Sequence, residues 1–196
     1  MAIKLSKGGK VSLSKAATSS GVTNWAQLVI GCSWGENQFE TGGANDLDAS
    51  AFKLGADGKV RQESDFCFYK NLDTAGLHHS GDERTGAKEG DDEAITVTFA
   101  DLEPGTEKVA FVVTIDGAEK SGKNFGSVVG AQFHIYDPTT GTDIIQVDLS
   151  EDFSTETAVV IGELYHHNGE WKFNSIQQGW SGGLKAVCEH YGLDVE

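Results

Sequence analysis

Short segments with alternating apolar and polar residues recur along most of the 196 residues of this chain. An alternation with a period of two is typical of a β-strand that is buried on one face only. The segments follow one another at intervals of roughly 10–20 residues, and clusters of Gly, Asp and Asn separate them, as in β-sandwiches. The pattern predicts a mostly β fold, a β-sandwich of two mainly antiparallel sheets. The predicted strands are residues 3–6, 11–13, 26–30, 47–54, 66–69, 95–99, 109–115, 131–136, 144–149, 158–165 and 171–176.

A short helix is predicted close to the C-terminal end of the sequence. Leu184, Val187, Cys188 and Tyr191 follow the i, i+3, i+4, i+7 spacing of an apolar stripe along a helix. Gly192 comes next, and glycine readily adopts the left-handed conformation in which many helices end. The other predicted local elements are a second short helix around residues 118–122 and hairpin turns at residues 55–58 and 167–170, which contain Asp-Gly and Asn-Gly.

The balance of charge restricts the partners of the chain. Acidic residues outnumber basic residues 30 to 15, which gives a net charge of −15 and a pI near 4.7. A surface this acidic repels a phosphate backbone, so the composition argues against direct binding of DNA or RNA. No segment approaches the ~18 consecutive apolar residues of a membrane-spanning helix, and lysines interrupt the N-terminal segment where a secretory signal needs an apolar core.

The three cysteines of the chain are scattered, and each of them lies among apolar residues. They are too few and too far apart in the sequence for a disulfide framework or a zinc site, so reduced cysteines in a protein core are expected. No linker of low complexity divides the chain. These observations predict a single domain over residues 1–196 in a cytoplasmic protein.

Two motifs resemble catalytic or nucleotide-binding sequences, but each lacks a feature that this function requires. Residues 179–183 match G-x-S-x-G around Ser181, but a nucleophile elbow is followed by an acid and then a histidine, and here His190 precedes Asp194. Residues 117–124 resemble a phosphate-binding P-loop, but Asn124 stands where a Ser or Thr should bind Mg²⁺. A small-molecule or nucleotide-binding module that uses the 117–126 loop stays open as the alternative function, and a hydrolase that uses Ser181 ranks third.

Clusters of carboxylates in two glycine-containing loops carry the functional signal. The first loop spans residues 35–48, and the second spans residues 81–93 with six acidic residues against two basic ones. Ca²⁺ binds six to eight oxygen ligands in flexible geometry, and acidic loops in which glycines let carbonyl groups approach suit that chemistry. A solvated acidic edge explains the same composition. From composition alone, both interpretations stay open.

The sequence resembles the TerD-type family of tellurium-resistance proteins from one end to the other. The central match is residues 46–52, read as Asp-Leu-Asp-Ala-Ser-Ala-Phe, together with Gly-Ala-Asp-Gly-Lys-Val at residues 55–60. The acidic loop of the family is matched by Gly-Asp at 81–82, Thr-Gly at 85–86 and Gly-Asp-Asp-Glu at 90–93. Further matches are residues 5–9, 124–126, 148–152, 154–157, 162–165 and 170–173.

This resemblance implies a calcium-binding, non-enzymatic stress-response protein with a β-sandwich fold and two Ca²⁺ ions at one end. It also implies that the partners are other proteins of the tellurium-resistance system, at the inner face of the membrane. The metal ligands expected from it are Asp46, Asp48, Asp82, Asp91, Asp92 and Glu93, with Glu36 and Glu83 as substitutes.

The sequence departs from the family pattern at three positions in the two loops. Trp34 is followed by Gly35, where the family usually has an aspartate, and Asp82 is followed by Glu83 instead of asparagine. Asn45 replaces the aromatic residue that normally precedes Asp46. These departures predict that ligands are recruited differently or that one of the two sites is weakened.

Overall fold

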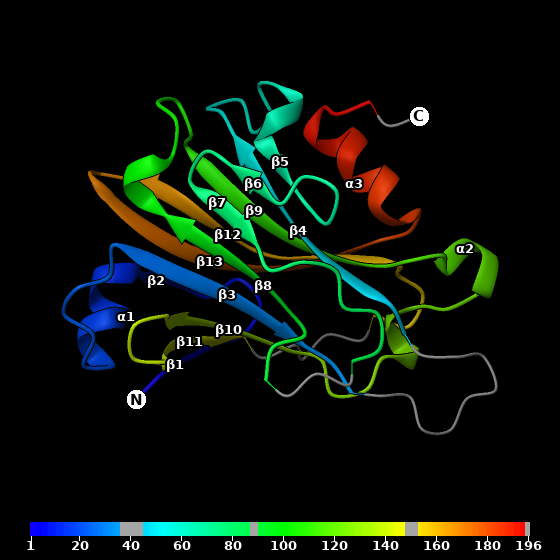
Figure 1. Ribbon diagram of the computed structural model, residues 1–196, viewed down its shortest axis with the longest axis horizontal. Coiled ribbons are helices and arrows are strands. Elements are labelled where there is room, and N and C mark those ends of the chain that lie inside the picture. The colour runs from blue at the N-terminus through cyan, green and yellow to red at the C-terminus, as the bar shows by residue number, and fades with distance from the viewer. Residues whose placement is uncertain (36–44, 87–89, 148–152, 195–196) are drawn as a thin grey trace.

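Two β-sheets pack against each other in the computed structural model, which describes residues 1–35, 45–86, 90–147 and 153–194 (Figure 1). Every strand pair is antiparallel except β1–β11, which is parallel. This architecture confirms the predicted sandwich of two mainly antiparallel sheets. In order across the seven-stranded sheet, the strands are β1 (Ile3–Leu5), β11 (Thr142–Val147), β10 (Gln132–Asp137), β3 (Gln27–Ser33), β8 (Glu93–Thr98), β7 (Leu77–His79) and β6 (Asp73–Thr74). In the six-stranded sheet they are β2 (Lys10–Ser12), β13 (Glu170–Trp180), β12 (Ala158–His167), β9 (Lys108–Ile115), β4 (Leu47–Leu54) and β5 (Phe66–Cys67).

The alternating residues that predicted the strands form the core between the sheets. In β3, Leu28, Ile30 and Cys32 belong to the main apolar cluster, and the residues between them face the other side of the sheet. Each fully buried Leu or Ile side chain stabilises the fold by about 1.5–3 kcal/mol. The three cysteines are all free and buried, as expected from their apolar surroundings.

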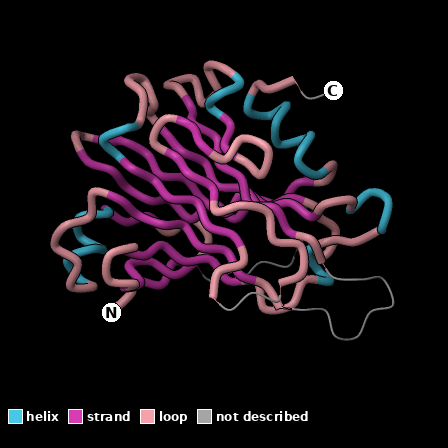
Figure 2. Tube along the Cα trace, in the orientation of Figure 1, coloured by secondary structure: helices cyan, strands magenta, loops and turns pink. Residues whose placement is uncertain are grey.

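A second apolar cluster covers the outer face of the six-stranded sheet, beneath helix α3 (Gly183–Tyr191). Val187, Cys188 and Tyr191 of the predicted stripe are buried there, and the ring of Tyr191 lies 4.9 Å from that of Phe52. Gly192 ends the helix with φ = 86°, as predicted. The helices are α1 (Leu13–Ser19), α2 (Ala118–Ser121) and α3, with 3₁₀ turns at Glu63–Asp65, Phe99–Asp101 and Phe125–Ser127. In the view of Figure 2 the helices lie around the strand layers, with α1 and α3 on opposite sides.

The structure differs from the sequence predictions mainly in short elements. The strand predicted at residues 11–13 ends at Ser12, because the Ser12 hydroxyl accepts a hydrogen bond from the Lys15 N–H and caps α1, which was not predicted. The strands β6 and β7 have two and three residues, too few for an alternation to be visible. The hairpin turn at residues 167–170 is confirmed, with positive φ at Asn168 and Gly169.

The edge of β4 prepares the site described below. β4 pairs with β9 along its whole length, but on its other side β5 pairs only with Ala51 and Phe52. Among the described strands, none pairs with residues 47–50 on that side. The first half of β4 therefore presents a strand edge toward the loop that follows β7.

Candidate metal site

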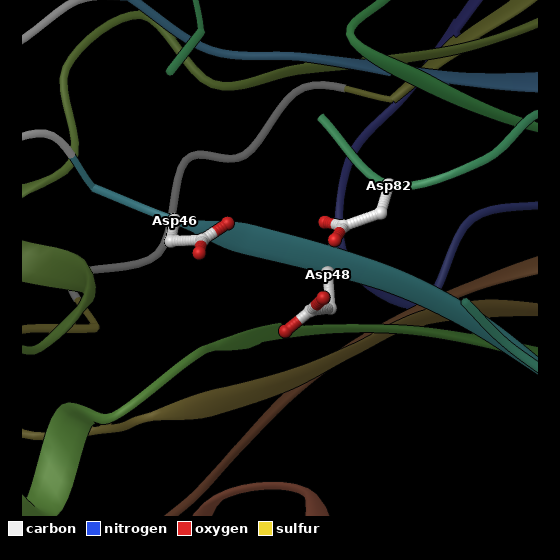
Figure 3. A group of neighbouring side chains, drawn as sticks. All are labelled: Asp46, Asp48 and Asp82. Atoms are coloured by element: carbon white, nitrogen blue, oxygen red, sulfur yellow. The ribbon is translucent and has the colours of Figure 1, made fainter. Parts of the chain in front are cut away.

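Three carboxylates gather at the end of the sandwich where β4 begins. Asp46 directly precedes β4, Asp48 is its second residue, and Asp82 comes from the loop that follows β7 in the other sheet. One oxygen atom from each side chain lies within 4.8 Å of the other two, and Figure 3 shows how the three side chains lie around β4. Among the residues that the structure describes, this is the only group of three or more potential ligands so close together.

The sequence places Asp46 and Asp48 on the same side because they are two residues apart in an extended chain. Leu47 and Ala49, which alternate with them, belong to the main apolar cluster. The core therefore fixes the direction of both carboxylates. Asp82 needs the tertiary fold, because β7 and its loop must pack beside the edge of β4 before it reaches the other two.

The environment of this three-aspartate cluster favours loss of negative charge. Burial, together with the charges of Glu93 and Asp46, raises the pKa of Asp48 to about 7. Burial also raises the pKa of Asp46 to about 6, with contributions from nearby carboxylates. In addition, the Oδ1 atom of Asp46 is buried and has no hydrogen-bond partner among the described residues. A bound cation would give this oxygen a partner and remove the repulsion.

Two further charged residues border the cluster and were not assigned to it from the sequence. The Nε and Nη2 atoms of Arg84 donate to Oδ2 of Asp82 at 2.9 and 2.7 Å, from a side chain that is 72% exposed. Asp116 follows β9, and its N–H donates to the carbonyl oxygen of Asp46 at 2.9 Å. Asp116 raises the pKa of both Asp46 and Asp48. Only the pairing of β4 with β9 reveals its position.

Asp91 is engaged on the outer face of the seven-stranded sheet. Its Oδ1 atom lies 2.8 Å from Nε2 of His134, whose Nδ1 lies 2.6 Å from Asp143. Gly31 lies beneath this pair, and a Cβ atom there would be 2.4 Å from Oδ2 of Asp91. The structure therefore does not bring Asp91 into the three-aspartate cluster.

The other predicted ligands have partners of their own. Oδ2 of Asp92 accepts a hydrogen bond from the Trp34 N–H at 2.8 Å. Oε1 of Glu83 accepts from the N–H and the hydroxyl of Thr85 at 2.9 and 2.6 Å. Glu93 is completely buried and accepts from two backbone N–H groups. Glu36 lies outside the described residues.

The two catalytic-looking motifs form no recognisable site. Ser181 is exposed in the turn between β13 and α3, and the ring of His190 packs against Trp180 at 4.6 Å between centroids. The loop of residues 117–126 contains α2, which has four residues and offers no helix of the length found in P-loop folds. In the part of the chain that the structure describes, no helix has both the length and the apolar character needed to cross a membrane.

Comparison with known proteins places this architecture in a family. The family model described as the TerD domain matches residues 1–191. The chain belongs to the TerD family. Over the full length of both chains, it is 45% identical to tellurium resistance protein TerD of Serratia marcescens and 44% identical to general stress protein 16U of Bacillus subtilis (strain 168).

A solved structure supports the fold of this TerD-family chain. A homologue of telluride resistance protein TerD from Streptomyces coelicolor A3(2) superposes with a TM-score of 0.67 at 17% identity. The match covers 86% of this chain and 98% of that one. The resemblance inferred from the sequence motifs is therefore confirmed at the level of family and fold.

Proposed function

We propose that this TerD-family protein is a Ca²⁺-binding, non-enzymatic stress-response protein of the tellurium-resistance type. The observation that carries the proposal is the three-aspartate cluster, in which Asp46 has a buried oxygen without a hydrogen-bond partner among the described residues. The names of the TerD relative and of general stress protein 16U support the biological setting. Other proteins of the tellurium-resistance system, at the inner face of the membrane, are the partners that this proposal implies.

The chemistry of the donor set selects a hard cation. The cluster of Asp46, Asp48 and Asp82 offers only carboxylate oxygens, without the imidazole or thiolate that Zn²⁺ and Cu²⁺ prefer. Ca²⁺ accepts irregular arrangements of six to eight oxygens, whereas Mg²⁺ requires near-ideal octahedral geometry and gives up its water reluctantly. Backbone carbonyls and water would complete the coordination of Ca²⁺.

The positions of the three aspartates suggest what a bound ion does for the protein. Asp48 lies in β4 of the six-stranded sheet and Asp46 directly precedes that strand, whereas Asp82 belongs to the loop that follows β7 of the seven-stranded sheet. An ion held by all three links the two sheets at one end of the sandwich and neutralises an acidic surface. A change in Ca²⁺ concentration would thereby alter the surface that partner proteins contact.

Calorimetric titration of metal-stripped protein with Ca²⁺ and with Mg²⁺ tests the proposal. We expect saturable Ca²⁺ binding that is weaker in Asp46→Asn and Asp48→Asn, and weaker binding of Mg²⁺ than of Ca²⁺. Asp101→Asn, which changes an exposed acid in the Phe99–Asp101 turn, is the matched control and should bind like the wild type. The stoichiometry decides between one ion and the two that the family resemblance implies.

Thermal unfolding provides an independent measurement. A ligand bound only by the folded state stabilises it by about 2.7 kcal/mol at 100-fold excess over Kd. For a chain of this length, that corresponds to an increase in Tm of roughly 5–10 °C. Equal melting temperatures in chelator and in millimolar Ca²⁺, together with no heat of binding, would leave a solvated acidic edge as the explanation.

A further inference from the structure

Backbone groups at the edge of β4 are satisfied by side chains where no neighbouring strand is present. The Ala49 N–H donates to Oε2 of Glu93 at 2.6 Å, and the Ala49 carbonyl oxygen lies 2.9 Å from Nε2 of His79. His79 and Glu93 come from β7 and β8 of the opposite sheet. Two side chains of one sheet therefore hold both backbone groups of Ala49 in the other.

The same two side chains also hold the loop that carries Asp82. Nδ1 of His79 accepts a hydrogen bond from the Gly81 N–H at 3.0 Å, and Oε1 of Glu93 accepts from the Glu83 N–H at 3.2 Å. The residues on both sides of Asp82 are thus fixed. Because Nδ1 is an acceptor, this arrangement assigns the ring proton to Nε2, which donates to Ala49.

Burial makes these four hydrogen bonds a rigid unit, which we call the Ala49 clamp. The side chains of His79 and Glu93 are both 0% exposed, and Nε2 of His79 lies 3.4 Å from Oε2 of Glu93. Water cannot replace a lost partner at such a site without opening the structure. The clamp therefore fixes the edge of β4 relative to the loop after β7.

The clamp acts directly beside the candidate ligands. Ala49 is the neighbour of Asp48, while Gly81 and Glu83 flank Asp82. Asp48 and Asp82 come from different sheets, so their separation depends on what joins the sheets at this point. Both carboxylate oxygens of Glu93 are already held by backbone N–H groups, which directs them away from a ligand role.

We infer that His79 and Glu93 are positioning residues that set the separation of Asp48 and Asp82 and thereby tune a metal site to which neither side chain is a ligand. This inference rests on the proposed Ca²⁺ binding. Outer partners of metal ligands commonly change metal affinity by 10–100-fold when they are mutated. The clamp explains how a site assembled from two sheets is organised before the ion arrives.

The decisive variant is His79→Ala, measured by Ca²⁺ calorimetry on the full chain. It removes half of the clamp and leaves every carboxylate of the region in place. We expect Kd to rise by about tenfold or more. His79→Gln can keep the donor to the Ala49 carbonyl, and His79→Asn can keep the acceptor for the Gly81 N–H, so each should show an intermediate Kd. If His79→Ala does not fold, these two variants replace it in the titration.

A destabilised control separates positioning from a general loss of stability. Leu164→Ala removes a completely buried side chain of β12 and should lower Tm while leaving the Kd for Ca²⁺ unchanged. The ratio of the Kd values for Mg²⁺ and Ca²⁺ is a second measurement. It should fall in the clamp variants, because a loosened site discriminates less between ion sizes.

A double-mutant cycle tests whether Glu93 acts through the clamp. If His79 and Glu93 work as one unit, His79→Ala combined with Glu93→Gln loses no more affinity than the worse single variant. Additive losses would show that Glu93 acts independently of His79 and would overturn its role in the clamp. If the wild type binds Ca²⁺ and the folded His79 variants bind it with a Kd within twofold of the wild-type Kd, the inference about the clamp is wrong but the proposed function stands. If the wild type binds no Ca²⁺, the proposed function itself is refuted.

Discussion

Lys53 offers the sharpest test of the energetics of this fold. Its side chain in β4 is 0% exposed, and Nζ lies 3.4 Å from Asp65, 3.1 Å from Glu103 and 3.1 Å from the carbonyl oxygen of Ala75. A buried ammonium group is stable only where such partners replace water. The side chain therefore ties β4 to three separate loops.

The cost of removing the ammonium group depends on what remains around Asp65. Breaking a buried ion pair typically costs 3–5 kcal/mol, because the remaining charge is left uncompensated. Here Asp65 keeps Arg61, whose Nε and Nη2 atoms each lie 3.2 Å from one of its oxygens, and Glu103 is 35% exposed. We therefore expect Lys53→Met, which keeps the aliphatic stem, to cost about 2 kcal/mol, below that range.

Lys53→Ala adds the loss of the buried stem to the loss of the charge. Three methylene groups at about 0.8 kcal/mol each contribute roughly 2 kcal/mol more, so the total is about 4–5 kcal/mol. Lys185→Met on the exposed side of α3 is the control and should change stability by less than about 0.5 kcal/mol.

Urea unfolding of metal-stripped protein, followed by tryptophan fluorescence, measures these differences. The hydrogen bonds and charges of Arg61 and Lys53 outweigh burial, so the pKa of Asp65 lies below its usual 3.8. The difference between the wild type and Lys53→Met should therefore be present above pH 4 and shrink as the pH falls through the lowered pKa. A Lys53→Met variant as stable as the wild type at pH 7 would show that the buried ion pair gives no net stabilisation and would refute this reasoning.

Two further predictions concern the three-aspartate cluster. Because the pKa values of Asp46 and Asp48 are raised to about 6 and about 7, the folded metal-free protein holds more protons than the unfolded chain between pH 4 and pH 7. Its Tm should therefore rise as the pH is lowered from 8 to 5. Over the same range, calorimetry should show the Ca²⁺ affinity falling, because protons compete for Asp46 and Asp48. A Ca²⁺ affinity that does not change with pH would contradict their assignment as Ca²⁺ ligands. Arg84→Ala should strengthen Ca²⁺ binding by about two- to fivefold, because it removes a positive charge that competes for Asp82, and an unchanged or weaker affinity would count against that role.

The sequence predicts those parts of the fold in which one repeated pattern outweighs everything else. The alternation in β3 and the stripe from Leu184 to Tyr191 are long enough to show their buried faces. The helix α1 has only Leu13, Ala16 and Ala17 on its buried face, and such small residues give a weak pattern. β7 has only three residues, so an alternation with a period of two does not stand out in it.

The residues of the candidate site also divide into those that could be predicted from the sequence and those that could not. Asp46 and Asp48 follow from local alternation, and Asp82 follows from the family resemblance. Asp116 was missed because its place beside Asp46 depends on the register of β4 against β9. Asp91 and Glu93 were both expected as metal ligands, but the chain bends before β8 begins. Asp91 therefore lies over Gly31 on the outer face of the sheet, while Glu93 lies inside.

The burial of all three cysteines has a consequence for how this protein withstands oxidants and electrophiles. Burial raises the pKa of Cys188 to about 11 and that of Cys67 to about 12, and it holds the pKa of the Cys32 thiol well above its usual range, helped by the nearby carboxylates. At pH 7, a thiol with a pKa near 11 is ionised in about one molecule in ten thousand. Since the thiolate is the reactive form, the three thiols form sulfenic acids and mixed disulfides slowly. Under the same oxidants, exposed thiols react faster than these buried ones.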